Sequence, residues 1–123
     1  MQGIHPFIPT DVKAAYINQL LRAGFDSIDF GSFVSPKAIP QMRDTAEVLA
    51  KLDLSGTTTK LLAIVANERG ALDACRHPEI SYLGYPFSIS ETFQLRNTNA
   101  TIAESVERTK AIQELCEKHG KQL

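Results

Sequence analysis

One carboxylate interrupts an apolar stretch of the chain, Asp29 in Ser-Ile-Asp-Phe-Gly. Burying a carboxylate is costly unless it is paired or bound to a metal ion. Two interpretations therefore stay open: a structural residue bonded to a neighbouring strand, or an active-site carboxylate at a strand end. Ser32 and Lys37 follow in a loop that two prolines stiffen. These side chains could hold a carboxylate or a phosphate, and a solvated loop is an equally good interpretation.

Motifs for metal, nucleotide or thiol chemistry are not evident elsewhere. His5, His77 and His119 are far apart in the sequence and lack the spacing of metal ligands, so we predict no metal site. There is no glycine-rich nucleotide motif. Cys75 and Cys116 are isolated, and we expect both to be helix residues that face a core. Two such cysteines without an export signal favour a cytoplasmic protein with reduced thiols.

The charge pattern excludes several classes of partner. Thirteen basic residues oppose fourteen acidic residues, for a net charge of −1. This balance argues against binding to nucleic acid or to anionic lipid. The longest apolar run, residues 61–66, is too short to cross a bilayer. We therefore expect neither nucleic acid nor membrane as a partner.

Helices and strands are predicted to alternate along the chain. Thr10 is a candidate N-cap for the first helix. Its buried face is predicted to carry apolar residues at three- and four-residue steps, namely Val12, Ala15, Tyr16, Leu20 and Ala23. Residues 88–100 are predicted to form a long polar loop. Helices are expected at 10–23, 44–52, 68–76 and 101–119, and strands at 25–30, 60–66 and 80–85.

This order indicates an α/β fold with parallel strands. An open doubly wound sheet and an arc of a (β/α)₈ barrel both fit it. A whole barrel needs about 250 residues, and this chain has 123. With a helix first and a helix last, both ends look cut, so we predict a single incomplete barrel domain over residues 1–123. Functional side chains then belong at the carboxyl ends of the strands, at 29–41, 67–69 and 85–99.

Two segments resemble one enzyme family. Residues 32–37, Ser-Phe-Val-Ser-Pro-Lys, and residues 39–42, Ile-Pro-Gln-Met, resemble the loop after strand 2 of 3-hydroxy-3-methylglutaryl-CoA (HMG-CoA) lyases. The second segment carries Ser90-Glu91-x-Phe93, Asn97-x-Asn99 and Ile102-x-Glu104-Ser105, and is similar to the region after strand 4. The spacing between the two segments also agrees. The resemblance runs from residue 1 to the end and identifies the elements as strands 2–4 with helices 1–4.

The resemblance implies a metal-dependent lyase barrel acting on an acyl-CoA. The family cleaves HMG-CoA to acetyl-CoA and acetoacetate with Mg²⁺ or Mn²⁺. The metal ion stabilises the negative charge that develops on the substrate oxygens. A base removes the proton of the tertiary hydroxyl group before the carbon–carbon bond breaks.

The resemblance also suggests roles for a few residues. Asp29 matches a catalytic carboxylate of the family, usually a longer Glu. Gln2 matches the glutamine of an Arg-Asp-Gly-Leu-Gln motif, and Ser32 matches a serine on the substrate side of the loop. Gln2, Ser32 and Lys37 are therefore candidates for substrate binding.

Other functional residues of the family have no counterpart in this sequence. These are the Arg and Asp of the strand-1 motif, the two histidines of a later His-x-His strand, and the cysteine of a glycine-rich loop. We therefore expect that the 123 residues alone neither bind the metal ion nor catalyse the reaction. Two alternatives stay open: part of a related barrel that condenses acetyl-CoA with 2-oxo acids, and a non-catalytic assembly or binding module. Exposed strand edges would favour self-association.

Overall fold

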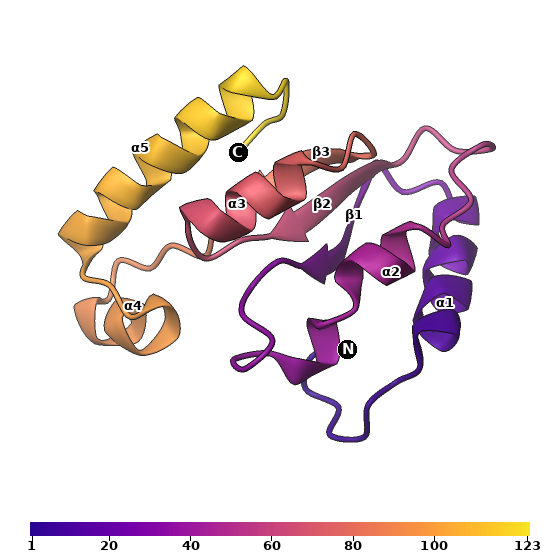
Figure 1. Ribbon diagram of the computed structural model, residues 1–123, viewed down its shortest axis with the longest axis horizontal. Coiled ribbons are helices and arrows are strands. Elements are labelled where there is room, and N and C mark those ends of the chain that lie inside the picture. The colour runs from indigo at the N-terminus through magenta and orange to yellow at the C-terminus, as the bar shows by residue number, and fades with distance from the viewer.

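The computed structural model describes residues 1–123 and confirms the alternation of helices and strands (Figure 1). One helix was not expected, α4, which lies inside the predicted polar loop. The elements are α1 Thr10–Arg22, β1 Ser27–Ser32, the 3-10 helix η1 Pro40–Met42, α2 Thr45–Leu49, β2 Lys60–Ile64, α3 Glu68–Cys75, β3 Ile80–Gly84, α4 Glu91–Thr98 and α5 Ile102–Lys118.

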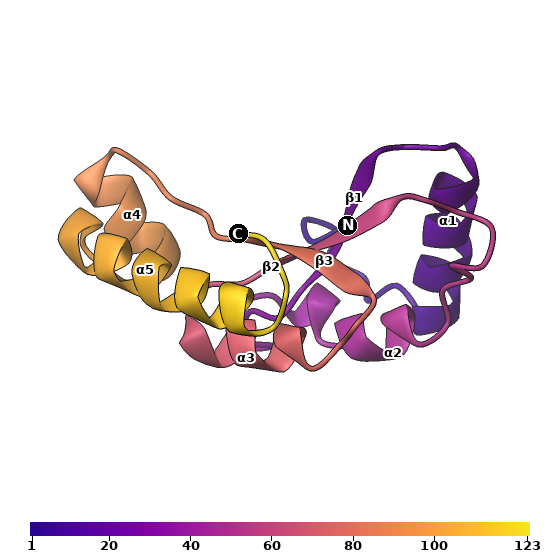
Figure 2. The same ribbon diagram turned by 90° about the horizontal axis from the view of Figure 1, so that it is seen from above.

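The three strands form one parallel sheet in the order β1-β2-β3. Figure 2 shows α2, α3 and α5 along one side of the strands, with the opposite side open. Burial in β2 follows this arrangement, because Leu61 and Ala63 are buried while Leu62 and Ile64 are half-buried. After α5 the chain returns to the sheet, where Gln122 forms a parallel bridge to Tyr82 of β3. A parallel sheet with helices on one side is the arrangement of an arc of a barrel wall.

The predicted cap and buried face of the first helix were wrong. Pro9 occupies the cap position, and the hydroxyl group of Thr10 instead donates to Asp44 Oδ2 over 2.7 Å. Val12 and Tyr16, which were expected to be buried, are exposed. The buried residues are Lys13, Ala14, Ile17 and Leu21. Ala14, Ile17 and Leu21 are also three and four residues apart, so apolar spacing alone does not decide between the two faces. Lys13 joins the buried face because it has an ionic partner inside the structure.

Helix α4 was missed because its buried residue is polar. Ser90 caps the helix by accepting a hydrogen bond from the Phe93 N–H over 3.4 Å. Gln94 is fully buried, and its amide accepts from the Ser88 N–H and donates to Ser105 Oγ, both over 2.7 Å. A helix that packs through an amide leaves no apolar stripe in the sequence.

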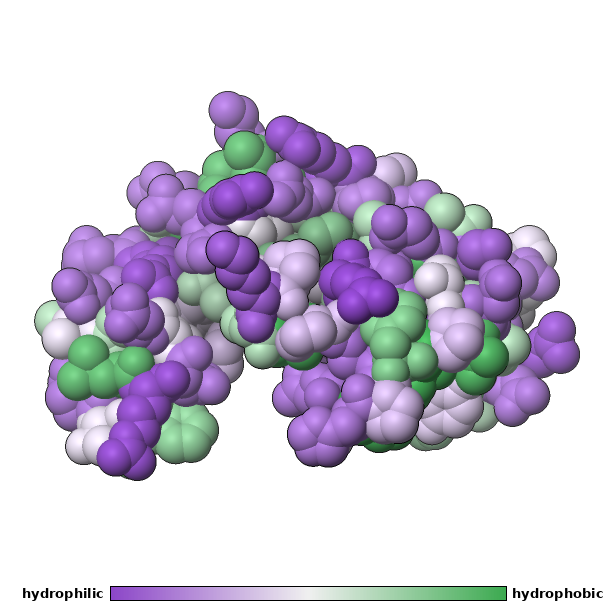
Figure 3. Space-filling model, turned by 60° about the horizontal axis from the view of Figure 1, so that its bottom comes forward, coloured by the Kyte–Doolittle hydropathy of each residue, from purple (hydrophilic) through white to green (hydrophobic).

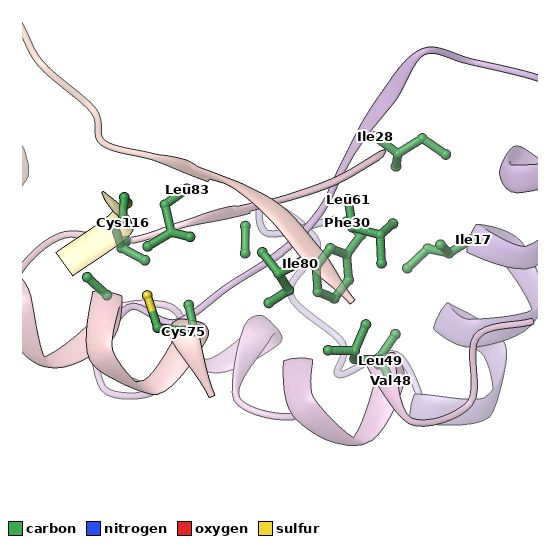
Figure 4. Close-up of a cluster of buried hydrophobic side chains, with 14 of the residues drawn as sticks. Ile17, Ile28, Phe30, Val48, Leu49, Leu61, Cys75, Ile80, Leu83 and Cys116 are labelled. Carbon is green, nitrogen blue, oxygen red and sulfur yellow. The ribbon is translucent and has the colours of Figure 1, made fainter. Parts of the chain in front are cut away.

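The core lies between the sheet and the helices, as Figure 4 shows. Phe30, Leu61 and Ile80 project from the strands toward the helices. Cys75 and Cys116 are buried in the same cluster, which confirms their expected location. Burial raises the pKa of the Cys116 thiol to about 11. None of the helices is both long enough and apolar enough to cross a membrane.

Candidate functional site

A hollow of about 520 Å³ lies at the carboxyl ends of the three strands. It is the region to which parallel α/β architectures assign function. Figure 3 shows a notch in the surface between the part of the molecule that carries α4 and the part that carries the N-terminal segment. Four polar side chains line the hollow, and they come from the N-terminal segment, β1 and α4: Gln2, Asp29, Ser32 and Asn97. The rest of the lining is mostly apolar.

Asp29 projects from the open side of the sheet and not from the packed side. The side chain is exposed, while its neighbours Ile28 and Phe30 are buried against the helices. No hydrogen bond joins the Asp29 carboxylate to a neighbouring strand, so the interpretation as a structural residue bonded across the sheet was wrong. Partial desolvation in the hollow raises the pKa of Asp29, although the Gly31 N–H and the chain's amino group oppose the rise. A carboxylate with a raised pKa is suited to exchanging a proton.

Ser32 is held in place by the beginning of α2. Its backbone N–H donates to Thr45 Oγ1 over 3.1 Å, and its Oγ accepts from the Val34 N–H over 3.1 Å. The preceding residue must be small, because a Cβ atom on Gly31 would lie 2.6 Å from Thr45 Cγ2. The register with β2 also shifts between Asp29 and Gly31. Together these contacts fix the Ser32 hydroxyl group at the hollow, and no acceptor within the chain takes its proton.

Gln2 and Asn97 line the hollow from separate parts of the chain. Gln2 is exposed in the irregular segment before α1, and Asn97 lies in the last turn of α4. Asn97 falls within residues 85–99, where the strand order predicts functional side chains, but it was not among the predicted site residues, because residues 88–100 were predicted to form a polar loop. The Ser90 cap followed by an acidic residue is the signal that would have indicated a helix there.

Lys37 does not line the hollow. It is exposed in the loop after β1, where its backbone N–H donates to Ser35 Oγ over 3.3 Å. The structure therefore brings Gln2, Asp29 and Ser32 together and leaves Lys37 outside. The functional roles of all four residues stay predictions.

The chemistry of the hollow is that of a polar binding surface. No three His, Cys, Asp or Glu side chains lie close enough to hold a metal ion. Asp29 is the only carboxylate in the lining. Amide, hydroxyl and carboxylate groups together can bind the oxygens of a small hydroxy acid. A second hollow of about 480 Å³, between β3 and α5, is mostly apolar and contains none of the predicted site residues.

Comparison with curated proteins identifies the relatives of this chain. It is 38% identical over 115 residues to "Hydroxymethylglutaryl-CoA lyase, mitochondrial" from Macaca fascicularis, a match that covers 91% of this chain and 34% of the relative. The chain is homologous to hydroxymethylglutaryl-CoA lyases. A second HMG-CoA lyase, described as cytoplasmic and from Rattus norvegicus, is 34% identical over 110 residues, which cover 88% of this chain and 31% of that protein. No protein-family model matches the chain.

The structural comparison agrees with the sequence comparison. An HMG-CoA lyase from Acenitobacter baumannii, solved in complex with coenzyme A and 3-methylmalate, superposes with a TM-score of 0.89 and 35% identity. The match covers 98% of this chain and 39% of that one. The fold is therefore part of a (β/α)₈ barrel, as predicted. The chain spans about a third of the length of the curated HMG-CoA lyases it matches.

Proposed function

We propose that this chain forms part of the substrate-binding face of an HMG-CoA lyase. The observation that carries the proposal is the convergence of Gln2, Asp29 and Ser32 on one hollow at the carboxyl ends of the strands. All three are residues for which the family resemblance predicts a role in the site. The proposed ligand is the branched hydroxy-acyl part of an acyl-CoA. Its carboxylate oxygens would accept hydrogen bonds from the Gln2 amide and the Ser32 hydroxyl group. Its own hydroxyl group would donate a hydrogen bond to the Asp29 carboxylate.

Each of these side chains has a proposed role. Asp29 accepts a hydrogen bond from the substrate hydroxyl group, and the raised pKa of its carboxyl group favours proton exchange there. Ser32 Oγ and the Gln2 amide donate to the carboxylate or thioester oxygens. For Lys37, which lies outside the hollow, the proposed role is binding of the anionic phosphates of the CoA portion. These contacts bind and orient a substrate.

The metal ion of the family does not fit the side chains of these 123 residues. A divalent cation needs several oxygen or imidazole donors, and the hollow offers one carboxylate. We therefore assign no step to a metal ion held by this chain. We propose that the chain by itself neither binds Mg²⁺ or Mn²⁺ at this site nor turns over HMG-CoA.

A binding and activity experiment tests the proposal. HMG-CoA is titrated into the 123-residue chain by calorimetry, and acetyl-CoA release is assayed with Mn²⁺ beside a longer chain extended at both ends to the length of the curated relatives. We expect binding without turnover by the short chain and metal-dependent turnover by the long one. Turnover by the short chain, or no binding at all, would contradict the proposal. If the long chain instead condenses acetyl-CoA with a 2-oxo acid, the related-barrel alternative is correct.

Self-association is a second part of the proposal. The chain exposes 7578 Å², whereas a compact monomer of 13.6 kDa exposes roughly 6,600 Å². The excess is comparable with the roughly 800 Å² that each partner buries in a standard interface. Both outer edges of the sheet lack a full partner strand. We expect the purified chain to form dimers or larger species by light scattering, and a monodisperse monomer at high concentration would contradict this.

The proposed location is the cytoplasm. Two buried, unpaired cysteines are compatible with a reducing compartment. One relative is described as cytoplasmic and another as mitochondrial. Expression of the chain with a fluorescent tag in its own cells tests the location, and accumulation in an organelle would contradict it.

A further inference from the structure

The segment before α1 has no regular secondary structure, yet one buried side chain ties it down. Gln41 is 4% exposed. Its Nε2 donates to the carbonyl oxygens of Ile4 over 2.8 Å and Pro6 over 2.9 Å, and its Oε1 accepts from the Ile8 N–H over 2.9 Å. Three backbone groups of one segment are thus satisfied by a single amide more than thirty residues away.

The other end of Gln41 is fixed just as firmly. Its backbone carbonyl accepts a hydrogen bond from the ammonium group of Lys13, which also pairs with Asp44. The ring of Phe7, in the same segment, contacts two cations, with its centroid 4.2 Å from Lys13 Nζ and 3.8 Å from Arg43 Cζ. Cation–π contacts of this kind hold an aromatic ring in place. The amide of Gln41 therefore has little freedom to follow the segment if that segment moves.

We propose that Gln41 is a positioning residue for the hollow. It acts on no ligand itself but holds residues 4–8 and, through them, Gln2, which lines the hollow together with Asp29. Ile39, which caps the 3-10 helix that contains Gln41, and Met42, the last residue of that helix, also line the hollow. Gln41 thus connects the wall made by the loop after β1 with the wall made by the N-terminal segment. The relevance of this to substrate binding rests on the proposed function.

If Gln41 only stabilised the fold, its replacement would accelerate amide exchange equally throughout the chain. Gln41→Met is a suitable replacement, because methionine has a volume similar to that of glutamine. The change removes all three hydrogen bonds to the segment while leaving the backbone carbonyl of Gln41 bonded to Lys13. The consequence should then be local release of residues 4–8 and not general destabilisation. Loss of three hydrogen bonds of ordinary strength corresponds to about a tenfold or greater loss of local protection.

Amide hydrogen exchange of the whole 123-residue chain tests the proposal. In Gln41→Met we expect exchange of the Ile8 N–H to accelerate by about tenfold or more, with chemical-shift changes at Gln2 and Asp29, while the amides of β2 keep their wild-type rates. The matched control is Gln94→Met, which removes the other buried amide and should release residues 88–105 but not residues 4–8. Equal acceleration throughout the chain, or no change at Ile8, would overturn the proposal.

A second variant covers the case in which Gln41→Met does not fold. Gln41→Glu keeps the acceptor for the Ile8 N–H but sets a carboxylate against the carbonyl oxygens of Ile4 and Pro6. Protonation of that carboxyl group restores one donor, so protection of Ile8 relative to amides of β2 should recover as the pH is lowered. A protection ratio that does not vary with pH would contradict the proposal. Calorimetry with HMG-CoA is a separate readout: if the wild type does not bind, the proposed function fails while the exchange result still decides the role of Gln41.

Discussion

Lys13 and Asp44 form a buried ion pair in which Nζ and Oδ1 are 2.6 Å apart, with side chains 2% and 10% exposed. The pair joins the first turn of α1 to the residue before α2. Asp44 also accepts a hydrogen bond from Thr10, so three polar groups share one small buried volume. Breaking such a pair leaves an uncompensated charge, which costs far more than losing an exposed pair.

Replacing Lys13 should therefore be strongly destabilising. Lys13→Met leaves the Asp44 carboxylate buried without its cation, and we expect the free energy of unfolding to fall by roughly 3 kcal/mol in urea denaturation. The control is Lys51→Met, which breaks the pair with Asp11 whose side chains are 51% and 82% exposed. That change should cost below about 1 kcal/mol. Similar losses in the two variants would contradict the assignment of the buried pair.

Asp44 should make stability depend on acid pH. Burial raises the pKa of its carboxyl group, but the hydrogen bonds from Lys13 and Thr10 outweigh this and hold the pKa below its usual value. A lowered pKa stabilises the folded state above the unfolded pKa of about 3.9, and the stabilisation is lost as the pH falls through the folded pKa. Unfolding measured from pH 6 to pH 2 should show this loss in the wild type and a shallower one in Asp44→Asn. If the free energy of unfolding fell equally with pH in the wild type and in Asp44→Asn, the lowered pKa of Asp44 would be contradicted.

Unlike Asp44, Asp29 should contribute to ligand binding and not to the stability of the fold. Because the pKa of its carboxyl group is raised, its ionisation disfavours the folded state as the pH rises through that value. Asp29→Asn should leave the free energy of unfolding at pH 7 equal or slightly higher while weakening HMG-CoA binding severalfold in calorimetry. Asp26→Asn is the control and should bind like the wild type, because Asp26 is an exposed residue just before β1 that does not line the hollow. A strongly destabilised Asp29→Asn would show that the carboxylate is structural.

Gly31 should tolerate no side chain. A Cβ atom there would lie 2.6 Å from Thr45 Cγ2, and overpacking of this kind typically costs about 1–3 kcal/mol. Gly31→Ala should lower the melting temperature and displace Ser32, which thermal unfolding and the Ser32 amide shift would both report. Gly3→Ala is the control, since a Cβ at Gly3 meets nothing within 4 Å. Equal melting temperatures for the two variants would contradict the close approach of β1 to α2.

The features that the sequence predicted are those expressed as apolar runs and short spacings. The run Leu61–Ala66 indicated a parallel strand, and the strand order then indicated where Asp29 and Ser32 would lie. The features that the sequence did not predict depend on buried polar side chains whose hydrogen-bond or ionic partners are distant in the sequence. Lys13 in α1, Gln94 in α4 and Gln41 beside the hollow each pack inside because a particular partner meets them. Such pairings follow from the tertiary structure and leave no periodic signal.

The measurement that tests the central claim most directly is a titration of the isotope-labelled chain with HMG-CoA, followed by NMR. The account predicts that the largest shift changes map to Gln2, Asp29, Ser32 and Asn97. Their midpoint should move to a severalfold higher HMG-CoA concentration in Asp29→Asn and stay unchanged in Asp26→Asn. Changes confined to the apolar hollow between β3 and α5, or no changes with a folded chain, would contradict it.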